Sequence, residues 1–192
     1  MSARVVTLAA FLLAAVTPAA AHRLDEYLQA TIVAVEKDRA RLDMYLTPGA
    51  NVLSSVLADI DADGNGIISE TEQRTYAARV LADLSLTLNG AQLSPRLVLV
   101  EFPALAQMQE GLGEIHLEFS VDLPRSGTNR TLRLANQHHS RIAVYQMNSL
   151  VSRDPDIRIG ALHRNPTQSV FELDYTQVER APVGGDRVNL KF

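Results

Sequence analysis

The sequence predicts an α+β fold, in which an antiparallel β-sandwich of the Ig-like type carries an inserted helix–loop–helix. Several short β-rich runs follow one another at roughly even spacing and are separated by turn residues, which is typical of a sandwich. Residues 48–84 instead show helical periodicity on both sides of an acidic stretch. With 192 residues, of which 46% are hydrophobic, the chain can bury one main core. We therefore expect one exported β-domain over residues 22–178, with the insertion at residues 48–84.

Residues 1–21 have the features of a secretory signal peptide. Arg4 gives a cationic start, an apolar run covers residues 5–16, and residues 19–21 are alanines of the kind that signal peptidase accepts. Cleavage is expected before His22. An uncleaved membrane anchor is the alternative, although the apolar run is shorter than the ~20 residues that span a bilayer. We expect the mature protein to be extracytoplasmic, either periplasmic or secreted, without a membrane span.

A β-hairpin and two helices are predicted at the start of the mature chain. Residues 28–36 and 40–46 are β-rich, and a polar turn joins them. Thr47 and Pro48 supply an N-cap and a first helical position, so a helix is expected over residues 48–59. A second helix is expected from Thr71 to about Ser85. Their apolar residues recur at helical spacing: Val52, Leu53, Val56, Leu57 and Ile60 in the first, and Tyr76, Val80, Leu81 and Leu84 in the second.

Strand patterns return after the second helix. Turn signals such as Asn89-Gly90 and the polar stretch at residues 124–129 separate them. Residues 179–192 are polar and rich in turn-formers, which predicts a flexible tail. The further strands are expected at residues 86–88, 97–102, 114–123, 130–136, 141–148 and 169–175.

The stretch between the two predicted helices, "DADGNGIISETE", has the spacing of a calcium-binding loop. Calcium takes six to eight oxygen ligands, and a twelve-residue loop of the EF-hand type delivers them from positions 1, 3, 5, 7, 9 and 12. Gly66 falls at the sharp bend, and Ile68 falls where an apolar side chain turns into the core. The predicted ligands are Asp61, Asp63, Asn65, the carbonyl of Ile67, Ser69 and Glu72.

An Asp/Gly turn that binds nothing would explain Gly64 and Gly66, but not the oxygen-bearing side chains at every ligand position. Residues 48–84 resemble an EF-hand, and a dockerin-type loop would lack the entering helix. Three carboxylates, one amide and a hydroxyl are less charged than the ligand sets of the tightest calcium buffers, so we expect a micromolar to millimolar affinity for Ca2+. Outside the cytosol such a site would be filled most of the time, which suits a brace better than a switch. Because the sequence has no second calcium-binding loop with which this EF-hand could pair, the EF-hand must pack on its own β-domain or pair with another chain.

Composition excludes several function classes. The net charge of -4 offers no basic face for nucleic acid. The chain has no cysteine and therefore no disulfide, which makes a bound metal a candidate source of stability. No nucleophile elbow, P-loop or dinucleotide fingerprint occurs, so we do not expect an enzyme. An unrecognised hydrolase remains an alternative, because catalytic triads can assemble from distant residues.

A broader resemblance covers residues 22–175. The stretches "AHRLDEYLQATIVAVE", "YLTPG", "YAARVLADLSLTLNG", "EGLGEIHLEF" and "IAVYQMNSLV" together resemble the extracytoplasmic domain of bacterial HupE/UreJ-type and related nickel/cobalt transporter proteins. That family continues into membrane helices, whereas this sequence stops before any, so direct transport is not expected. The resemblance implies a membrane transporter or another protein as partner. A periplasmic accessory that handles nickel, cobalt or copper is therefore the alternative to a calcium-braced interaction module.

The histidines are the residues that could test the accessory role. After cleavage, His22 would present an α-amine and an imidazole, a pair suited to copper or nickel, and it is the candidate second metal ligand. His138 and His139 are expected in a solvated turn between strands, with a transition-metal site as the less favoured alternative. His116 is expected within a strand and His163 in a loop, and the sequence indicates no partner for either.

Overall fold

The computed structural model describes residues 24–124 and 127–178 of the protein. The predicted signal peptide at residues 1–21, the candidate ligand His22 and the predicted tail at residues 179–192 lie outside these ranges. The described chain is mostly β-structure with three helices, which agrees with the predicted α+β class. None of the helices in the described ranges is long and apolar enough to cross a membrane.

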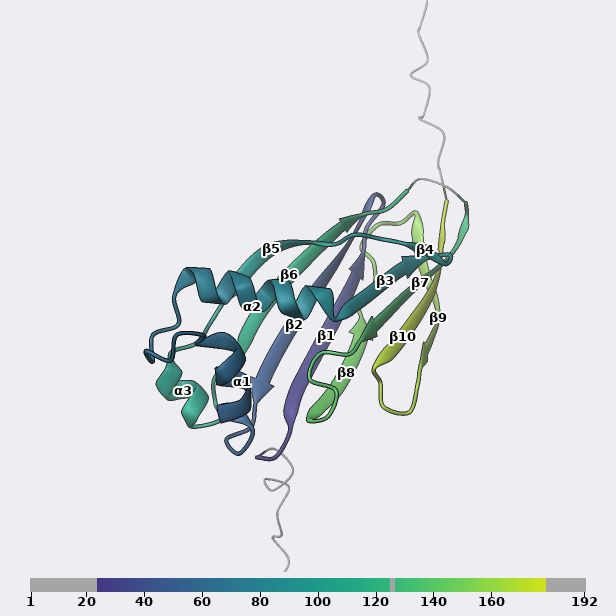
Figure 1. The fold of residues 1–192 in the computed structure, drawn as a ribbon. Coiled ribbons are helices and arrows are strands. Elements are labelled where there is room, and N and C mark those ends of the chain that lie inside the picture. The colour runs from purple at the N-terminus through teal and green to yellow at the C-terminus, as the bar shows by residue number, and fades with distance from the viewer. Residues whose placement is uncertain (1–23, 125–126, 179–192) are drawn as a thin grey trace, which may run out of the picture.

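Ten strands form two five-stranded sheets, and Figure 1 shows them as two layers. Strand order is β5-β6-β2-β1-β8 in the first sheet and β4-β3-β7-β10-β9 in the second. The first sheet contains β1 (Tyr27–Val35), β2 (Arg39–Pro48), β5 (Arg96–Glu101), β6 (Ile115–Asp122) and β8 (Ala143–Ser149). The second contains β3 (Leu84–Leu88), β4 (Ala91–Gln92), β7 (Asn129–Asn136), β9 (Ile157–Arg164) and β10 (Val170–Gln177).

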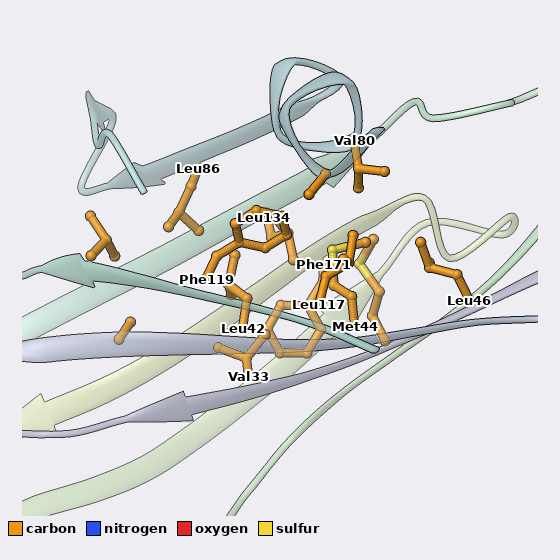
Figure 2. Close-up of a cluster of buried hydrophobic side chains, with 14 of the residues drawn as sticks. Val33, Leu42, Met44, Leu46, Val80, Leu86, Leu117, Phe119, Leu134 and Phe171 are labelled. Atoms are coloured by element: carbon orange, nitrogen blue, oxygen red, sulfur yellow. The ribbon is translucent and has the colours of Figure 1, made fainter. Parts of the chain in front are cut away.

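The hydrophobic core lies between the two sheets. Alternate residues of β1 are buried over its whole length, as expected for a strand with one face in a core. Figure 2 shows Leu42 and Phe119 of the first sheet beside Leu134 and Phe171 of the second. All four side chains are fully buried, and each contributes roughly 1.5–3 kcal/mol relative to an exposed position. This common core holds the two sheets together.

The predicted hairpin of β1 and β2 is confirmed, but the first helix begins later than predicted. Strand β2 continues to Pro48, which pairs with Tyr27, and helix α1 spans Leu53–Ile60. The backbone N–H of Gly49 donates to the carbonyl of Glu26, so the chain finishes the hairpin before it turns. Pro48 therefore ends a strand, beyond the last residue of β2 that pairs with β6, where its missing N–H costs nothing.

The second helix, α2 (Glu70–Ala82), starts and ends slightly earlier than predicted. Tyr76, Ala77 and Val80 are its buried residues, which agrees with the predicted apolar face. Leu84, however, belongs to β3, because β3 pairs with β7 from Leu84 onward. Figure 1 shows α1 close to α3 (Leu105–Gln109) at one end of the sheets, while α2 leads directly into β3.

Three features of the fold differ from the sequence-based expectation. Strands β1 and β8 pair in parallel, so the sheets are rich in antiparallel pairs without being purely antiparallel. Strand β9 was not predicted, and it places His163 in a strand instead of a loop. It is largely exposed at a sheet edge and contains Gly160, so it lacks the buried alternation that identifies other strands. The short elements α3 and β4 were not predicted either.

Candidate metal centre

The loop that joins α1 to α2 is held at both ends by helix caps. Asp61 follows the last residue of α1, and its backbone N–H donates to the carbonyl of Leu57. Ser69 is the N-cap of α2, where its hydroxyl accepts from the N–H of Glu72 while the Glu72 carboxylate accepts from the N–H of Ser69. This reciprocal capping box fixes the direction in which the chain enters α2.

Three predicted ligands converge in this loop. One carboxylate oxygen from each of Asp61, Asp63 and Glu72 lies within 4.8 Å of the others. Oxygens bound to one Ca2+ at 2.3–2.6 Å can be at most about 5 Å apart, so this spacing fits a shared cation. Within residues 24–124 and 127–178, this is the one cluster of at least three acidic or histidine side chains that could share an ion.

The loop backbone curls around the Asp61 carboxylate. The N–H of Asn65 donates to Asp61 Oδ1 over 3.1 Å, and the N–H of Gly66 donates to Oδ2 over 2.9 Å. Gly64 and Gly66 adopt φ values of +68° and +78°, which glycine tolerates far better than other residues. The Asp63 carboxylate in turn accepts from the backbone and the side chain of Asn65. The acidic side chains are therefore oriented by the loop itself.

Replacing Gly66 by alanine is expected to lower the free energy of unfolding by about 1 kcal/mol, because the left-handed conformation strains any residue with a Cβ. A Cβ at this position would meet no atom within 4 Å, so strain is the only cost. Urea unfolding of the metal-free protein measures this change in the free energy of unfolding. Gly64→Ala should cost about as much, because Gly64 is also left-handed and a Cβ there would likewise meet no atom within 4 Å. An unchanged stability in both variants would contradict the loop conformation.

Glu72 connects the two ends of the loop. Its Oε1 accepts from the backbone N–H of Ala62 over 2.9 Å, and its Oε2 accepts from the N–H and the hydroxyl of Ser69. The hydrogen bond donated by the Ser69 backbone lowers the pKa of the Glu72 carboxyl. The side chain is therefore ionised at neutral pH, as a metal ligand must be.

Two of the other predicted ligands, Asn65 and Ser69, are hydrogen-bonded to these acidic side chains. The Asn65 side chain donates to Asp63 and accepts from the N–H of Ile67. Ser69 contacts Glu72 as described above. Ile67 is 71% exposed and, having a hydrocarbon side chain, can offer only its carbonyl, while Ile68 packs against the core as predicted.

The prediction of a solvated turn is wrong for His138. This side chain is buried, with Nε2 2.9 Å from the hydroxyl of Tyr76 and Nδ1 2.8 Å from the carboxylate of Asp83. The carboxylate can only accept, so Nδ1 carries the proton and Nε2 accepts from Tyr76. The Tyr76 hydroxyl also lies 2.6 Å from that of Tyr27. Because both ring nitrogens are engaged, His138 is not placed to bind a metal.

The two histidines for which the sequence indicated no partner differ in their surroundings. His116 stacks on Tyr45, and its two ring nitrogens lie 3.8 Å from Asp43 and 3.5 Å from Glu101. The two carboxylates face opposite edges of the ring, which is not a chelating arrangement. His163 lies on the exposed edge strand β9, outside the acidic cluster.

Acidification below about pH 6.5 is expected to destabilise the fold through His138. Burial lowers the pKa of its imidazole, and the bond to Asp83 offsets this only in part. The unfolded chain, with an ordinary histidine pKa near 6.5, then binds the proton more readily, so the free energy of unfolding decreases as the pH falls. Urea unfolding at pH 7.5 and pH 5.5 without calcium measures the effect. His138→Gln should reduce this pH dependence, and an equal dependence in both proteins would contradict it.

Sequence reasoning missed the partners of His138, because they are far away in the chain. Tyr27, Tyr76 and Asp83 lie between 55 and 111 residues from His138, and no local pattern links them. Asp83 follows the last residue of α2, where an acidic side chain is unfavourable for the helix dipole. That unusual placement was the one signal in the sequence.

Comparison with known proteins gives no family for this chain. No protein-family model matches it, and no curated protein or solved structure matches it significantly. Its function must therefore be argued from its own residues.

Proposed function

We propose that residues 61–72 form a calcium site of the EF-hand type, and that the bound ion braces an exported β-domain with the architecture of an Ig-like sandwich. The observation that carries this proposal is the convergence of Asp61, Asp63 and Glu72, at positions 1, 3 and 12 of the loop. Backbone carbonyl and side-chain oxygens of Asn65, Ile67 and Ser69 would complete the coordination.

The chemistry of the donors favours calcium over other metals. Every predicted ligand atom is an oxygen, which suits hard cations, and no imidazole or thiol belongs to the cluster. Magnesium requires near-ideal octahedral geometry at 2.0–2.1 Å, whereas calcium accepts the irregular set that a curled loop provides. The two carboxylate oxygens of Glu72 would fill two positions of a seven-coordinate ion.

The loop is well placed to stabilise the β-domain. Ile68 packs on the core directly after the predicted ligand Ile67. On either side, Val56 and Ile60 of α1 and Tyr76 and Val80 of α2 belong to the same buried cluster as the sheet residues. A ligand that binds only the folded loop stabilises everything that unfolds with it. We therefore propose a structural role for the ion, in a non-enzymatic module that serves interaction with a protein partner such as a membrane transporter.

The site is tested by titrating Ca2+ into the metal-free protein in a calorimeter. The proposal predicts one Ca2+ per chain, with a dissociation constant between roughly 10⁻⁶ and 10⁻³ M. Mg2+ in a parallel titration should bind more weakly. Heats equal to those of dilution up to 10 mM Ca2+ would overturn the proposal.

The alternative roles have less support. Handling of nickel, cobalt or copper would rest on His22, which lies outside the described residues, and the ring of His138 is already engaged. An unrecognised hydrolase would need an accessible reactive group. The series of hydrogen bonds from Asp83 through His138 to Tyr76 instead ends on Tyr27, which is buried. Burial also raises the pKa of Tyr76, so its hydroxyl stays protonated at neutral pH.

A further inference from the structure

The turn between β7 and β8 carries two adjacent histidines that contact different helices. The rings of His138 and His139 are nearly perpendicular, with their centroids 4.5 Å apart. His138 reaches Tyr76 on α2 and Asp83 just after it, while His139 reaches Asp59 on α1. One turn of the β-domain therefore holds both helices that flank the acidic loop.

The backbone of His138 is held by hydrogen bonds to side chains from both sheets. Its carbonyl accepts from the side chains of Gln29 on β1 and Tyr145 on β8, and its N–H donates to the side chain of Asn136 on β7. Asn136 also donates to Gln29, which closes the network. Because all these groups are buried, losing one partner would leave another unsatisfied at a cost of about 1–3 kcal/mol. The position of the turn is thus set by the β-domain and not by the loop.

His139 maintains its contact in a strained conformation. Its φ is +48°, in the left-handed region that costs a residue with a side chain roughly 1–2 kcal/mol. This conformation places Nε2 3.2 Å from the Asp59 carboxylate, while the ring packs edge-on against Tyr27. Strain of this kind persists only where the surrounding structure holds it in place.

Asp59 is also the point where the two helices are joined directly. Arg79 of α2 donates to the carbonyl of Asp59 over 2.9 Å and approaches its carboxylate at 3.3 Å. Asp59 precedes the ligand Asp61 by two residues, and Tyr76 follows the ligand Glu72 by four. The contacts of the two histidines therefore act close to the two ends of the loop.

We propose that His138 and His139 are positioning residues for the calcium loop, which hold α1 and α2 so that the Asp61 and Glu72 carboxylates stay within coordination distance before the ion arrives. This inference rests on the proposed calcium function. A site whose ligands are already held in place loses less entropy on binding, so a loosened helix pair lowers affinity without removing any ligand. The ion in turn stabilises the contacts between the helices and the β7–β8 turn.

The test compares Ca2+ dissociation constants of variants that leave all six predicted ligands intact. His139→Asn tolerates a left-handed φ, but its shorter side chain does not reach Asp59. It should raise the dissociation constant at least about fivefold, at the lower end of typical coupling between sites. Tyr76→Phe, which removes the hydroxyl bonded to His138, should also raise the dissociation constant. This variant replaces His139→Asn in the test if His139→Asn does not fold. His139→Gln, whose longer amide can still donate to Asp59, should restore most of the affinity.

Thr131→Val is the matched control for general destabilisation. It removes the hydroxyl that donates to Asp174 over 2.6 Å in the second sheet, away from both helices. Its dissociation constant should stay within about twofold of the wild-type value. Wild-type affinity in His139→Asn and Tyr76→Phe, or an equal loss in Thr131→Val, would overturn the inference. Absence of Ca2+ binding by the unmodified protein would instead overturn the proposed function itself, so the two failures are distinguishable.

Discussion

Glu72→Gln is expected to weaken Ca2+ binding by on the order of 100-fold. A carboxylate at the last loop position can supply two charged oxygens to the ion, whereas an amide supplies one neutral oxygen. In either orientation the amide nitrogen would also face a donor, namely the N–H of Ala62 or the N–H and hydroxyl of Ser69. Competition with a chromophoric chelator measures the dissociation constant.

Glu70→Gln is the control for this substitution. Glu70 also lies in the first turn of α2 and is exposed, but it is not among the three converging side chains. Its replacement changes the local charge equally and should alter the dissociation constant by less than about threefold, since exposed charges interact weakly. Equal effects of the two substitutions would show that general electrostatics, and not ligation by Glu72, attract the cation.

Phe119→Ala is expected to have the largest effect on stability, with a loss of about 3–5 kcal/mol in the free energy of unfolding. Phe119 lies on β6 with no exposed surface, and Figure 2 places it against side chains from both sheets. Truncation leaves a cavity that neither sheet can fill without moving. Since a domain is stable by only about 5–15 kcal/mol, much of the margin would be lost. Urea unfolding monitored by circular dichroism measures the change.

The matched control for the core is Val98→Ala. Val98 lies on β5, the strand that pairs with β6, but its side chain is 55% exposed. Its truncation should cost less than about 0.5 kcal/mol. A loss below 1 kcal/mol for Phe119→Ala would mean that the two sheets do not share the core described above.

Elements with a strong local pattern could be predicted from the sequence. Strand β1 alternates between buried and partly exposed residues, and α2 has an apolar face and a capping box. The convergence of Asp61, Asp63 and Glu72 follows from a spacing that could be read in the sequence, because these residues lie close together in the chain. Each of these patterns depends on residues within about one turn or one strand of each other, where period and spacing are informative.

Features that depend on distant residues could not be predicted. The parallel pairing of β1 with β8 joins residues more than a hundred positions apart. The burial of His138 depends on Tyr76 from an inserted helix and on Asp83, so its sequence context, which is that of a polar turn, was misleading. The edge strand β9 packs little of its surface and therefore has no hydrophobic period to detect.

The same distinction applies to the candidate site. Sequence spacing indicates which residues could be ligands, but it cannot indicate what holds the two helices in place. That information comes from the contacts of Asp59 with Arg79 and His139, and from those of Tyr76 with His138. The proposed ion and these contacts stabilise the same geometry, which is what a structural brace requires.

The dependence of the free energy of unfolding on Ca2+ concentration measures whether a bound ion braces the β-domain. If the loop binds Ca2+ only when folded and unfolds together with the β-domain, the free energy of unfolding should rise by about 1.4 kcal/mol for each tenfold increase in Ca2+ above the dissociation constant. The β-sheet signal in circular dichroism should show this shift in the unmodified protein and lose most of it in Glu72→Gln over the same concentration range. A free energy of unfolding that stays constant from metal-free conditions to 10 mM Ca2+ would contradict the account.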